Sequence, residues 1–268
     1  MPSENTIKQY ERIINTLVSR GGTDLTDTKK VLALVKTKIN GEEASLPSQS
    51  SQLNAVIWKI GDAPQKEVYR KAMMENNKTI FENKTYTKTE KSVEWDELSK
   101  LYEKTDRVMD KAILALYSLA PPRRILDYTN MMVVDKEPSD TSKNYLVMGH
   151  KPYFVFNVYK TAGTYGKQKF EVPKELLDIL TPIIKENDWL LRTTRGTQFT
   201  SPLFSLNMKN ITERVSDGKI KATINTFRHA FISEILKYNP STKRRKTISY
   251  MMGHNVSTQL EYDERDEE

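Results

Sequence analysis

The sequence predicts a mostly helical protein of the α+β class, in which a small helical N-terminal domain precedes a larger domain with a small β-sheet. Apolar residues recur at helical spacing over residues 1–75, and residues 76–92 are polar and weakly periodic. Beyond them, short alternating apolar runs stand among further helical patterns. A chain of 268 residues is long enough for two such domains. We therefore expect a helical domain over 1–90, which includes a linker at about 76–92, and a second domain over 91–268.

Four short helices are expected in the N-terminal domain, because four apolar stripes follow one another between residues that interrupt helices. The stripes are Ile7, Tyr10, Ile14 and Leu17, then Val31, Leu34, Val35 and Ile39, then Leu53, Val56, Ile57 and Ile60, and last Val68, Tyr69 and Met73. The interruptions are Gly21-Gly22, Asn40-Gly41, Gly61 and Pro64. A polar loop, EEASLPSQSSQ, is expected before the third stripe. Four helices of this length make a small bundle.

The second domain mixes helices with short strands. A helix at about 106–119 is ended by Pro121-Pro122. Strands are expected at 131–134, 145–148, 153–159 and 168–172. The last two flank KTAGTYGK, a turn with two glycines, so a β-hairpin is expected over 153–172. Further helices are expected at about 174–186, 206–215, 223–238 and 244–252.

Composition excludes several classes of protein. The chain has no cysteine and three histidines, which rules out disulfides and argues against a metal centre. We expect no metal and no cofactor. No apolar run approaches the roughly 20 residues that a membrane helix needs, and the first residues lack the apolar stretch of a secretory signal. We therefore expect an intracellular protein with no membrane partner and no small-molecule substrate.

Positive charge is concentrated in the second domain. Residues 1–100 hold 16 Lys and Arg against 14 Asp and Glu, whereas residues 101–260 hold 25 against 15. The last eight residues, EYDERDEE, hold one against six. The whole chain carries a formal charge of +7. A face that binds phosphates would give this distribution, and so would solvated lysine faces.

Cleaving a DNA strand without a metal requires a particular set of side chains. A nucleophile attacks phosphorus, fixed cations meet the charge on the non-bridging oxygens, and an acid protonates the leaving 5′ oxygen. Arginine suits the cationic role because its planar fork matches phosphate and stays protonated. Lysine can supply the proton, and tyrosine can hold the DNA in a phosphodiester.

Five segments supply these residue types in one order along the chain. They are Pro121-Pro122-Arg123-Arg124 with Asp127 following, Tyr159-Lys160-Thr161 in the hairpin turn, Asn225 to Phe231 around Arg228, Gly253-His254, and Tyr262 near the C-terminal end of the sequence. Taken singly, the arginine pair and the hairpin lysine are more typical of ordinary surface residues than of a site, and Arg228 is as typical of a structural ion pair. Gly253-His254 and Tyr262 indicate little by themselves. The ordered set is what indicates an active site that acts on DNA.

This ordered set resembles the tyrosine recombinase (integrase) family, and its PPRR-x-x-DY motif is similar to that of integrase-like members carried by viruses and mobile elements. The specific motifs cover residues from about 120 to 262, whereas the N-terminal helices resemble the family's core-binding domain only in size and pattern. The resemblance implies a core-binding domain that contacts DNA, followed by a catalytic domain. Together they would close around duplex DNA as a C-shaped clamp.

The resemblance also implies roles for the arginines. In the family's first motif an arginine stands three residues before an acid, which makes Arg124 the first catalytic arginine and Asp127 the residue that orients it. Arg123 is the alternative. Arg228 matches the family's second arginine.

The remaining roles follow in the same way. Lys160 matches the hairpin lysine that acts as the general acid, His254 matches a hydrogen-bond donor to the phosphate, and Tyr262 matches the nucleophile. Two positions depart from the family's pattern. Asn225 stands where histidine is usual, and asparagine can donate a hydrogen bond but cannot exchange a proton. Tyr262 follows His254 by eight residues, about one fewer than is common, and Tyr250 is a weaker alternative nucleophile.

The function that the resemblance implies is site-specific recombination or integration of DNA. Strands would be cut and rejoined through a 3′-phosphotyrosyl bond, without ATP or metal, by a homotetramer on paired DNA sites. One alternative is a type IB topoisomerase, which relaxes DNA with a similar set of residues. The other is a catalytically inactive relative that only binds DNA.

Overall fold

The computed structural model describes residues 2, 4–22, 24–82 and 93–254. The chain divides into two compact units, Met1–Thr87 and Lys88–Glu268. The domain boundary predicted near residue 90 lies outside the described residues. No helix in the described part of the chain is both long and apolar enough to cross a membrane.

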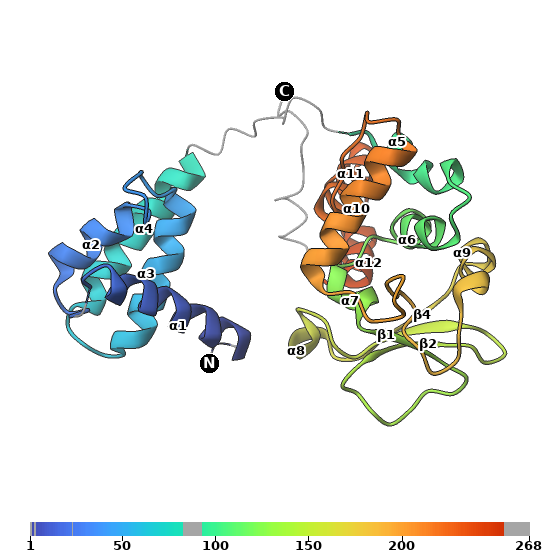
Figure 1. The fold of residues 1–268 in the computed structure, drawn as a ribbon, viewed down its shortest axis with the longest axis horizontal. Coiled ribbons are helices and arrows are strands. Elements are labelled where there is room, and N and C mark those ends of the chain that lie inside the picture. The colour runs from blue at the N-terminus through green and yellow to red at the C-terminus, as the bar shows by residue number, and fades with distance from the viewer. Residues whose placement is uncertain (1, 3, 23, 83–92, 255–268) are drawn as a thin grey trace. The chain divides into compact units, whose positions relative to one another are not determined.

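The N-terminal unit is a bundle of helices, shown in blue to cyan in Figure 1. Its helices are α1 (Glu4–Ser19), α2 (Thr28–Lys36), α3 (Leu46–Ile60) and α4 (Lys66–Glu82). Most residues of the four predicted apolar stripes supply its core, with Leu17, Val31, Leu53 and Tyr69 almost fully buried. Ile39 and Val68 are exceptions, because both are exposed. The prediction of four helices is therefore confirmed.

Three boundaries in this unit were predicted wrongly. Helix α2 ends at Lys36, before Ile39 and the expected stop at Asn40-Gly41. Helix α3 begins at Leu46, inside the expected polar loop, because Pro47 starts the helix and two polar side chains find partners within the unit. Gln49 Nε2 donates to the carbonyl of Ala44 at 2.7 Å, and Ser50 Oγ donates to Asn77 Oδ1 at 3.0 Å. Helix α4 likewise continues to Glu82, through residues expected to begin the linker. Residues 83–92 lie outside the described part.

The C-terminal unit combines a four-stranded sheet with helices, and Figure 1 shows the sheet along one side of the unit. Its helices are α5 (Trp95–Ser99), α6 (Val108–Ser118), α7 (Ile125–Thr129), α8 (Ala162–Tyr165), α9 (Lys174–Leu180), α10 (Ser201–Val215), α11 (Ile224–Lys237) and α12 (Thr242–Met252), with 3-10 turns at Leu101–Lys104 and Thr181–Ile183. Its strands are β1 (Met131–Val134), β2 (Asn144–Val147), β3 (Tyr153–Phe156) and β4 (Gln168–Glu171). This is the mostly helical α+β fold that the sequence predicts.

The strands lie in chain order in the sheet. β1 pairs with β2 in parallel, and β2–β3 and β3–β4 are antiparallel. The register joins Tyr153 to Glu171 and Phe156 to Gln168, so the expected hairpin is confirmed. The segment KTAGTYGK is more than a turn, because its centre forms the short helix α8.

Helix α6 is the centre of the unit's core. Six consecutive residues, from Ala112 to Tyr117, are fully buried, so α6 is covered on every side. The ring of Tyr117 packs against Tyr128, Phe204 and Phe227, which brings α7, α10 and α11 to the same core. α7 and α11 carry the candidate arginine motifs, so this packing fixes their backbones relative to each other.

Prolines explain the boundaries that differ from prediction in this unit. The helix expected over 174–186 ends at Leu180, and Pro182 directs the following residues into a 3-10 turn. α10 begins at Ser201, five residues earlier than expected, because Pro202 occupies its first turn.

Candidate active site

Some of the candidate residues gather at the C-terminal end of α12, namely Arg123, Arg124, Arg228 and His254. The last carbonyls of a helix have no partner within the helix and must find one elsewhere. Here side chains from other elements supply hydrogen bonds to them. Tyr250 O accepts from Gln168 Nε2 at 2.9 Å, Met251 O from Arg123 Nη1 at 2.5 Å, Met252 O from Arg228 Nη1 at 3.4 Å, and Gly253 O from Arg124 Nη1 at 2.7 Å and Thr161 Oγ1 at 2.9 Å. Segments more than 80 residues apart in sequence therefore meet at one helix end.

Gly253 makes this arrangement possible. It ends α12 in the left-handed conformation, with φ of 64° and ψ of 43°, which glycine adopts without steric cost. The chain turns there so that the next residue, His254, faces α11. Arg228 Nη2 lies 3.0 Å from His254 Nδ1, and both residues are buried. The structure thus brings two residues from separate predicted motifs, Arg228 and His254, into contact.

The proton on His254 can be assigned from this contact. A guanidinium only donates hydrogen bonds, so His254 Nδ1 accepts and Nε2 carries the ring proton. Burial, then Arg228, Arg124 and Arg123, lower the pKa of His254 to about 3. The ring is therefore neutral at physiological pH, and its Nε2–H is a donor suited to a phosphate oxygen.

The two adjacent arginines of the first motif have different surroundings. Arg123 is 2% exposed, and its Nε donates to Asp127 Oδ2 at 2.8 Å. Arg124 is half-buried and bonds through Nη1 to the carbonyl of Gly253. Asp127 was expected to orient Arg124, but in the structure it pairs with Arg123. Burial raises the pKa of Asp127, and the attraction of Arg123 opposes that effect.

Lys160 lies between two anchored residues in the segment that joins β3 to α8. Tyr159 is buried and donates through its hydroxyl to the carbonyl of Gly166 at 2.6 Å, while Thr161 bonds to Gly253. The lysine side chain itself is exposed. Thr161 thus ties the loop that carries Lys160 to the end of α12.

Asn144 on β2 anchors the start of the same loop. Its side chain is fully buried, accepts from the backbone N–H groups of Asn157 and Val158, and donates to the carbonyl of Val158. Gln168 on β4 is likewise fully buried. Neither residue was identified from the sequence, although a buried amide within a short apolar strand is an unusual choice that points to a specific partner.

Asn225 lies in the first turn of α11 and is exposed. It precedes Arg228 by three residues, a spacing that places both on one face of the helix. The helix start is well formed, because Thr223 caps it and pairs with Thr226. Whether Asn225 takes part in the site stays a prediction.

Tyr262, the predicted nucleophile, lies outside the described residues. The alternative, Tyr250, lies on α12 with 38% of its surface exposed, and its ring packs edge-on against Phe170. That packing gives Tyr250 a structural role at the base of the hairpin. The assignment of the nucleophile stays a prediction.

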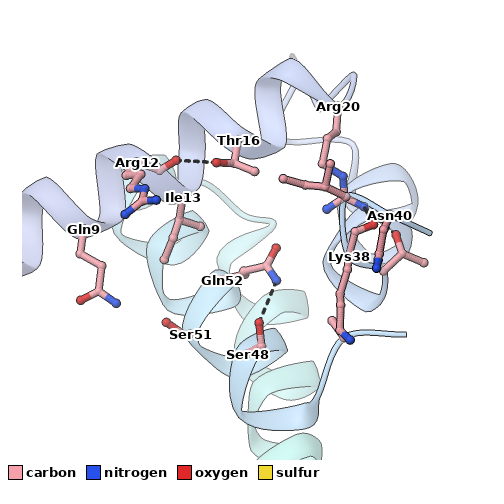
Figure 2. Close-up of a pocket in the computed structure, with 13 residues that line it drawn as sticks. Gln9, Arg12, Ile13, Thr16, Arg20, Lys38, Asn40, Ser48, Ser51 and Gln52 are labelled. Atoms are coloured by element: carbon pink, nitrogen blue, oxygen red, sulfur yellow. Dashed lines mark hydrogen bonds between the residues drawn. The ribbon is translucent and has the colours of Figure 1, made fainter. Parts of the chain in front are cut away.

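The N-terminal unit has a separate groove, of about 730 Å³, between α1, the loop after α2 and the start of α3. Figure 2 shows Arg12 and Arg20 on one wall, Lys38 and Asn40 on the loop, and Gln52 across from them on α3. Arg20 donates to Thr37 and to the carbonyl of Lys38, which holds this loop against α1. The lining combines cations with amides and hydroxyls, the groups that contact phosphates and sugars of nucleic acids.

The buried neutral histidine has a measurable consequence. Because the pKa of His254 is lowered from 6.5 to about 3 on folding, the unfolded chain takes up a proton below pH 6.5 that the folded protein does not. The stabilisation is therefore complete above pH 6.5 and is lost as pH falls toward 3. Between pH 7.5 and 5.5 this group should lower the free energy of unfolding by about 1.4 kcal/mol.

The matched variant is His254→Gln, which keeps an acceptor for Arg228 but does not titrate. Urea denaturation at the two pH values should show a smaller loss of stability in the variant than in the wild type, by that amount. Equal losses in the two proteins would mean that His254 is not held neutral. His229, whose pKa is also lowered by burial, is present in both proteins and cancels in the comparison.

Comparisons with known proteins bear on the fold. No protein-family model matches the sequence, and no curated protein matches it. The crystal structure of the XerA recombinase aligns with 99% of this chain and 89% of its own, at 15% identity and a TM-score of 0.50. The Tn1549 transposon integrase, solved in complex with transposon right end DNA, aligns over 96% and 94% at 15% identity and a TM-score of 0.47. The chain therefore shares the fold of the XerA recombinase, as the resemblance in its motifs predicts.

Proposed function

We propose that this protein is a site-specific DNA recombinase or integrase that cuts and rejoins strands through a 3′-phosphotyrosyl bond. The observation that carries the proposal is the convergence of Arg124, Arg228 and His254 on one helix end, from three separate motifs. Each motif supplies a residue type that strand cleavage needs, and the motifs lie far apart in the chain. The shared fold with a recombinase supports the same function.

The arginines would hold the scissile phosphate. Arg124 uses Nη1 on the Gly253 carbonyl, and a guanidinium has further N–H donors that can meet non-bridging oxygens. Arg228 is buried, so its charge acts in a medium where electrostatic attraction is strong. His254 would add a neutral donor through Nε2. All three stabilise the charge that grows as phosphorus becomes five-coordinate.

Bond making and breaking would involve two other residues. The phenolic oxygen of Tyr262 attacks phosphorus, the bond from phosphorus to the 5′ oxygen breaks, and Lys160 gives its proton to that oxygen. The phenolic proton passes to solvent, since Asn225 has no site that can take it. Rejoining reverses these steps with a 5′ hydroxyl as the attacking group. The energy of the original bond is kept in the phosphotyrosine, so we propose that neither ATP nor a metal is needed.

The N-terminal unit would contribute to DNA binding through the groove that contains Arg12, Arg20 and Lys38. Together with the C-terminal unit it would close around the duplex as a clamp, and recombination would bring four protomers to two DNA sites. We propose an intracellular location with DNA, and an origin in a virus or mobile element, in keeping with the PPRR-x-x-DY motif.

Covalent trapping on a nicked suicide duplex tests the central step. Wild-type protein should form an adduct that survives SDS, and Tyr262→Phe should form none. Arg124→Ala and Arg228→Ala should lower the cleavage rate by about 10²- to 10³-fold, because each removes a donor to the transition state, while DNA affinity changes far less. Arg214→Ala is the matched control, because Arg214 pairs with Asp110 on the surface.

Three results would count against the proposal. A folded, DNA-bound wild type that gives no adduct would identify a binding protein without cleavage activity. Equal losses of binding and cleavage in the arginine variants would assign them a structural role. An adduct with relaxation of supercoiled DNA, but no recombinants from two marked sites, would favour a topoisomerase.

The role of Lys160 predicts a specific rescue. A substrate with sulfur at the bridging 5′ position has a leaving group that needs no proton. Lys160→Ala should therefore cleave ordinary DNA about 10²- to 10⁴-fold more slowly than wild type, and the sulfur substrate at nearly the wild-type rate. Arg228→Ala should stay slow on both substrates. A Lys160→Ala defect of the same size on both would remove this lysine from the general-acid role.

Binding of phosphates in the N-terminal groove predicts a salt dependence. A variant that cannot bind one of these phosphates should reduce the slope of log affinity against log salt by about 0.9. Arg12→Ala and Lys38→Ala, measured by fluorescence anisotropy on duplex DNA at several salt concentrations, should each show this reduction. Lys174→Ala is the control, since Lys174 is almost fully exposed at the start of α9. Slopes that match the wild type in both groove variants would show that DNA does not lie in this groove.

A further inference from the structure

Arg123 is surrounded by partners within the protein. It is 2% exposed, and its guanidinium lies over the ring of Phe156 at 3.8 Å. Its Nε donates to Asp127, and its Nη1 donates to both Gln168 Oε1 at 3.0 Å and Met251 O at 2.5 Å. Burying a guanidinium is costly unless such partners are present. The Nε and Nη1 donors of Arg123 are therefore used inside the protein.

The partners of Arg123 lead to the last turn of α12. Arg123 binds the carbonyl of Met251 directly, and Gln168, which it also binds, donates to the carbonyl of Tyr250. Positive charge at the C-terminal end of a helix is favoured by the helix dipole as well. One arginine and one glutamine therefore hold two consecutive carbonyls, those of Met251 and Tyr250, in the last turn before Gly253.

The backbone of Gly253 lies directly against the same arginine. A β-carbon built on Gly253 would be 3.0 Å from Arg123 Nη2 and 3.3 Å from a ring carbon of Tyr159. The chain leaves α12 through this narrow space. The next residue after Gly253 is His254, which contacts Arg228. The position of the Arg123 guanidinium thus determines the path of the chain from α12 to His254.

We propose that Arg123, together with Gln168, is a positioning residue that fixes the end of α12 and, through Gly253, places His254 beside Arg228. The two neighbouring arginines of the first motif then have separate tasks, because Arg124 faces the phosphate and Arg123 holds the helix that completes the site. The inference rests on the proposed function for its catalytic consequence. Its structural part, the anchoring of α12, can be tested without any reaction.

The variants are chosen so that the protein stays folded. Gln168→Met keeps the volume of the side chain and removes its bonds to Arg123 and Tyr250. The double variant Arg123→Met with Asp127→Leu removes a buried pair of opposite charges together, which is often nearly neutral for stability. Gln198→Met is the matched control, because Gln198 also donates to a backbone carbonyl, that of Thr129, in the same unit.

Hydrogen exchange measures the anchoring in full-length protein without DNA. The amides of Gly253 and His254 donate to Tyr250 O and Ser249 O, so they are protected while the end of α12 is held. Gln168→Met and the double variant should exchange these two amides at least about tenfold faster, while the amides of α6 keep their protection. Unchanged exchange at Gly253 and His254 would overturn the inference.

Single-turnover cleavage measures the consequence for the reaction. A displacement of catalytic groups by about 1 Å can cost about 10²-fold in rate. We expect a fall of this order in the cleavage rate constant, with the final adduct yield and DNA affinity unchanged and with no rescue by the 5′-sulfur substrate. A purely structural role would lower the yield and leave the rate constant as it is. Gln198→Met should behave as wild type.

The outcomes distinguish failure of the positioning role from failure of the proposed recombinase function. Faster exchange at a wild-type cleavage rate would overturn the positioning role and leave the recombinase function standing. If wild-type protein forms no adduct at all, the proposed function fails, and hydrogen exchange still decides whether Arg123 and Gln168 hold α12.

Discussion

The end of α12 is the feature on which the rest of the site depends. A helix leaves its last carbonyls without partners, and most helices satisfy them with water or a local turn. Here Gln168, Arg123, Arg228 and Arg124 bond to four successive carbonyls. Because these side chains come from β4, from the segment before α7 and from α11, the helix end joins three parts of the unit that the chain separates widely.

The same contacts explain how three guanidinium groups can lie close together at the end of α12. Three guanidiniums lie near one another with Asp127 as a carboxylate among them, and the negative end of the α12 dipole supplies further compensation. The charge is balanced only in part. His254 responds to the remaining positive charge and to its own burial by staying neutral. A phosphate bound beside these arginines would neutralise the remaining positive charge. This is the electrostatic reason that the geometry suits a DNA strand.

The larger elements could be predicted from local patterns, because apolar residues alternate along strands and recur at helical spacing along helices. The stripes of α1 to α4 and the strands β1 to β4 fall where apolar residues repeat. The start of α3 was missed because Gln49 and Ser50 are polar but buried, and their partners come from other positions in the unit. Motif spacing favoured Arg124 as the first catalytic arginine, yet it could not tell which of the two arginines is buried. That depends on Phe156, Gln168 and the helix end, which are distant in sequence.

The most direct test of the account is to identify the residue that carries the DNA. Protein trapped on a suicide duplex would be digested with nuclease and protease, and the peptide bearing a nucleotide would be sequenced by mass spectrometry. The account predicts a single modified peptide with the nucleotide on Tyr262, eight residues beyond the His254 that α12 places beside Arg228. A nucleotide on Tyr250, on a serine or on any other residue would contradict it.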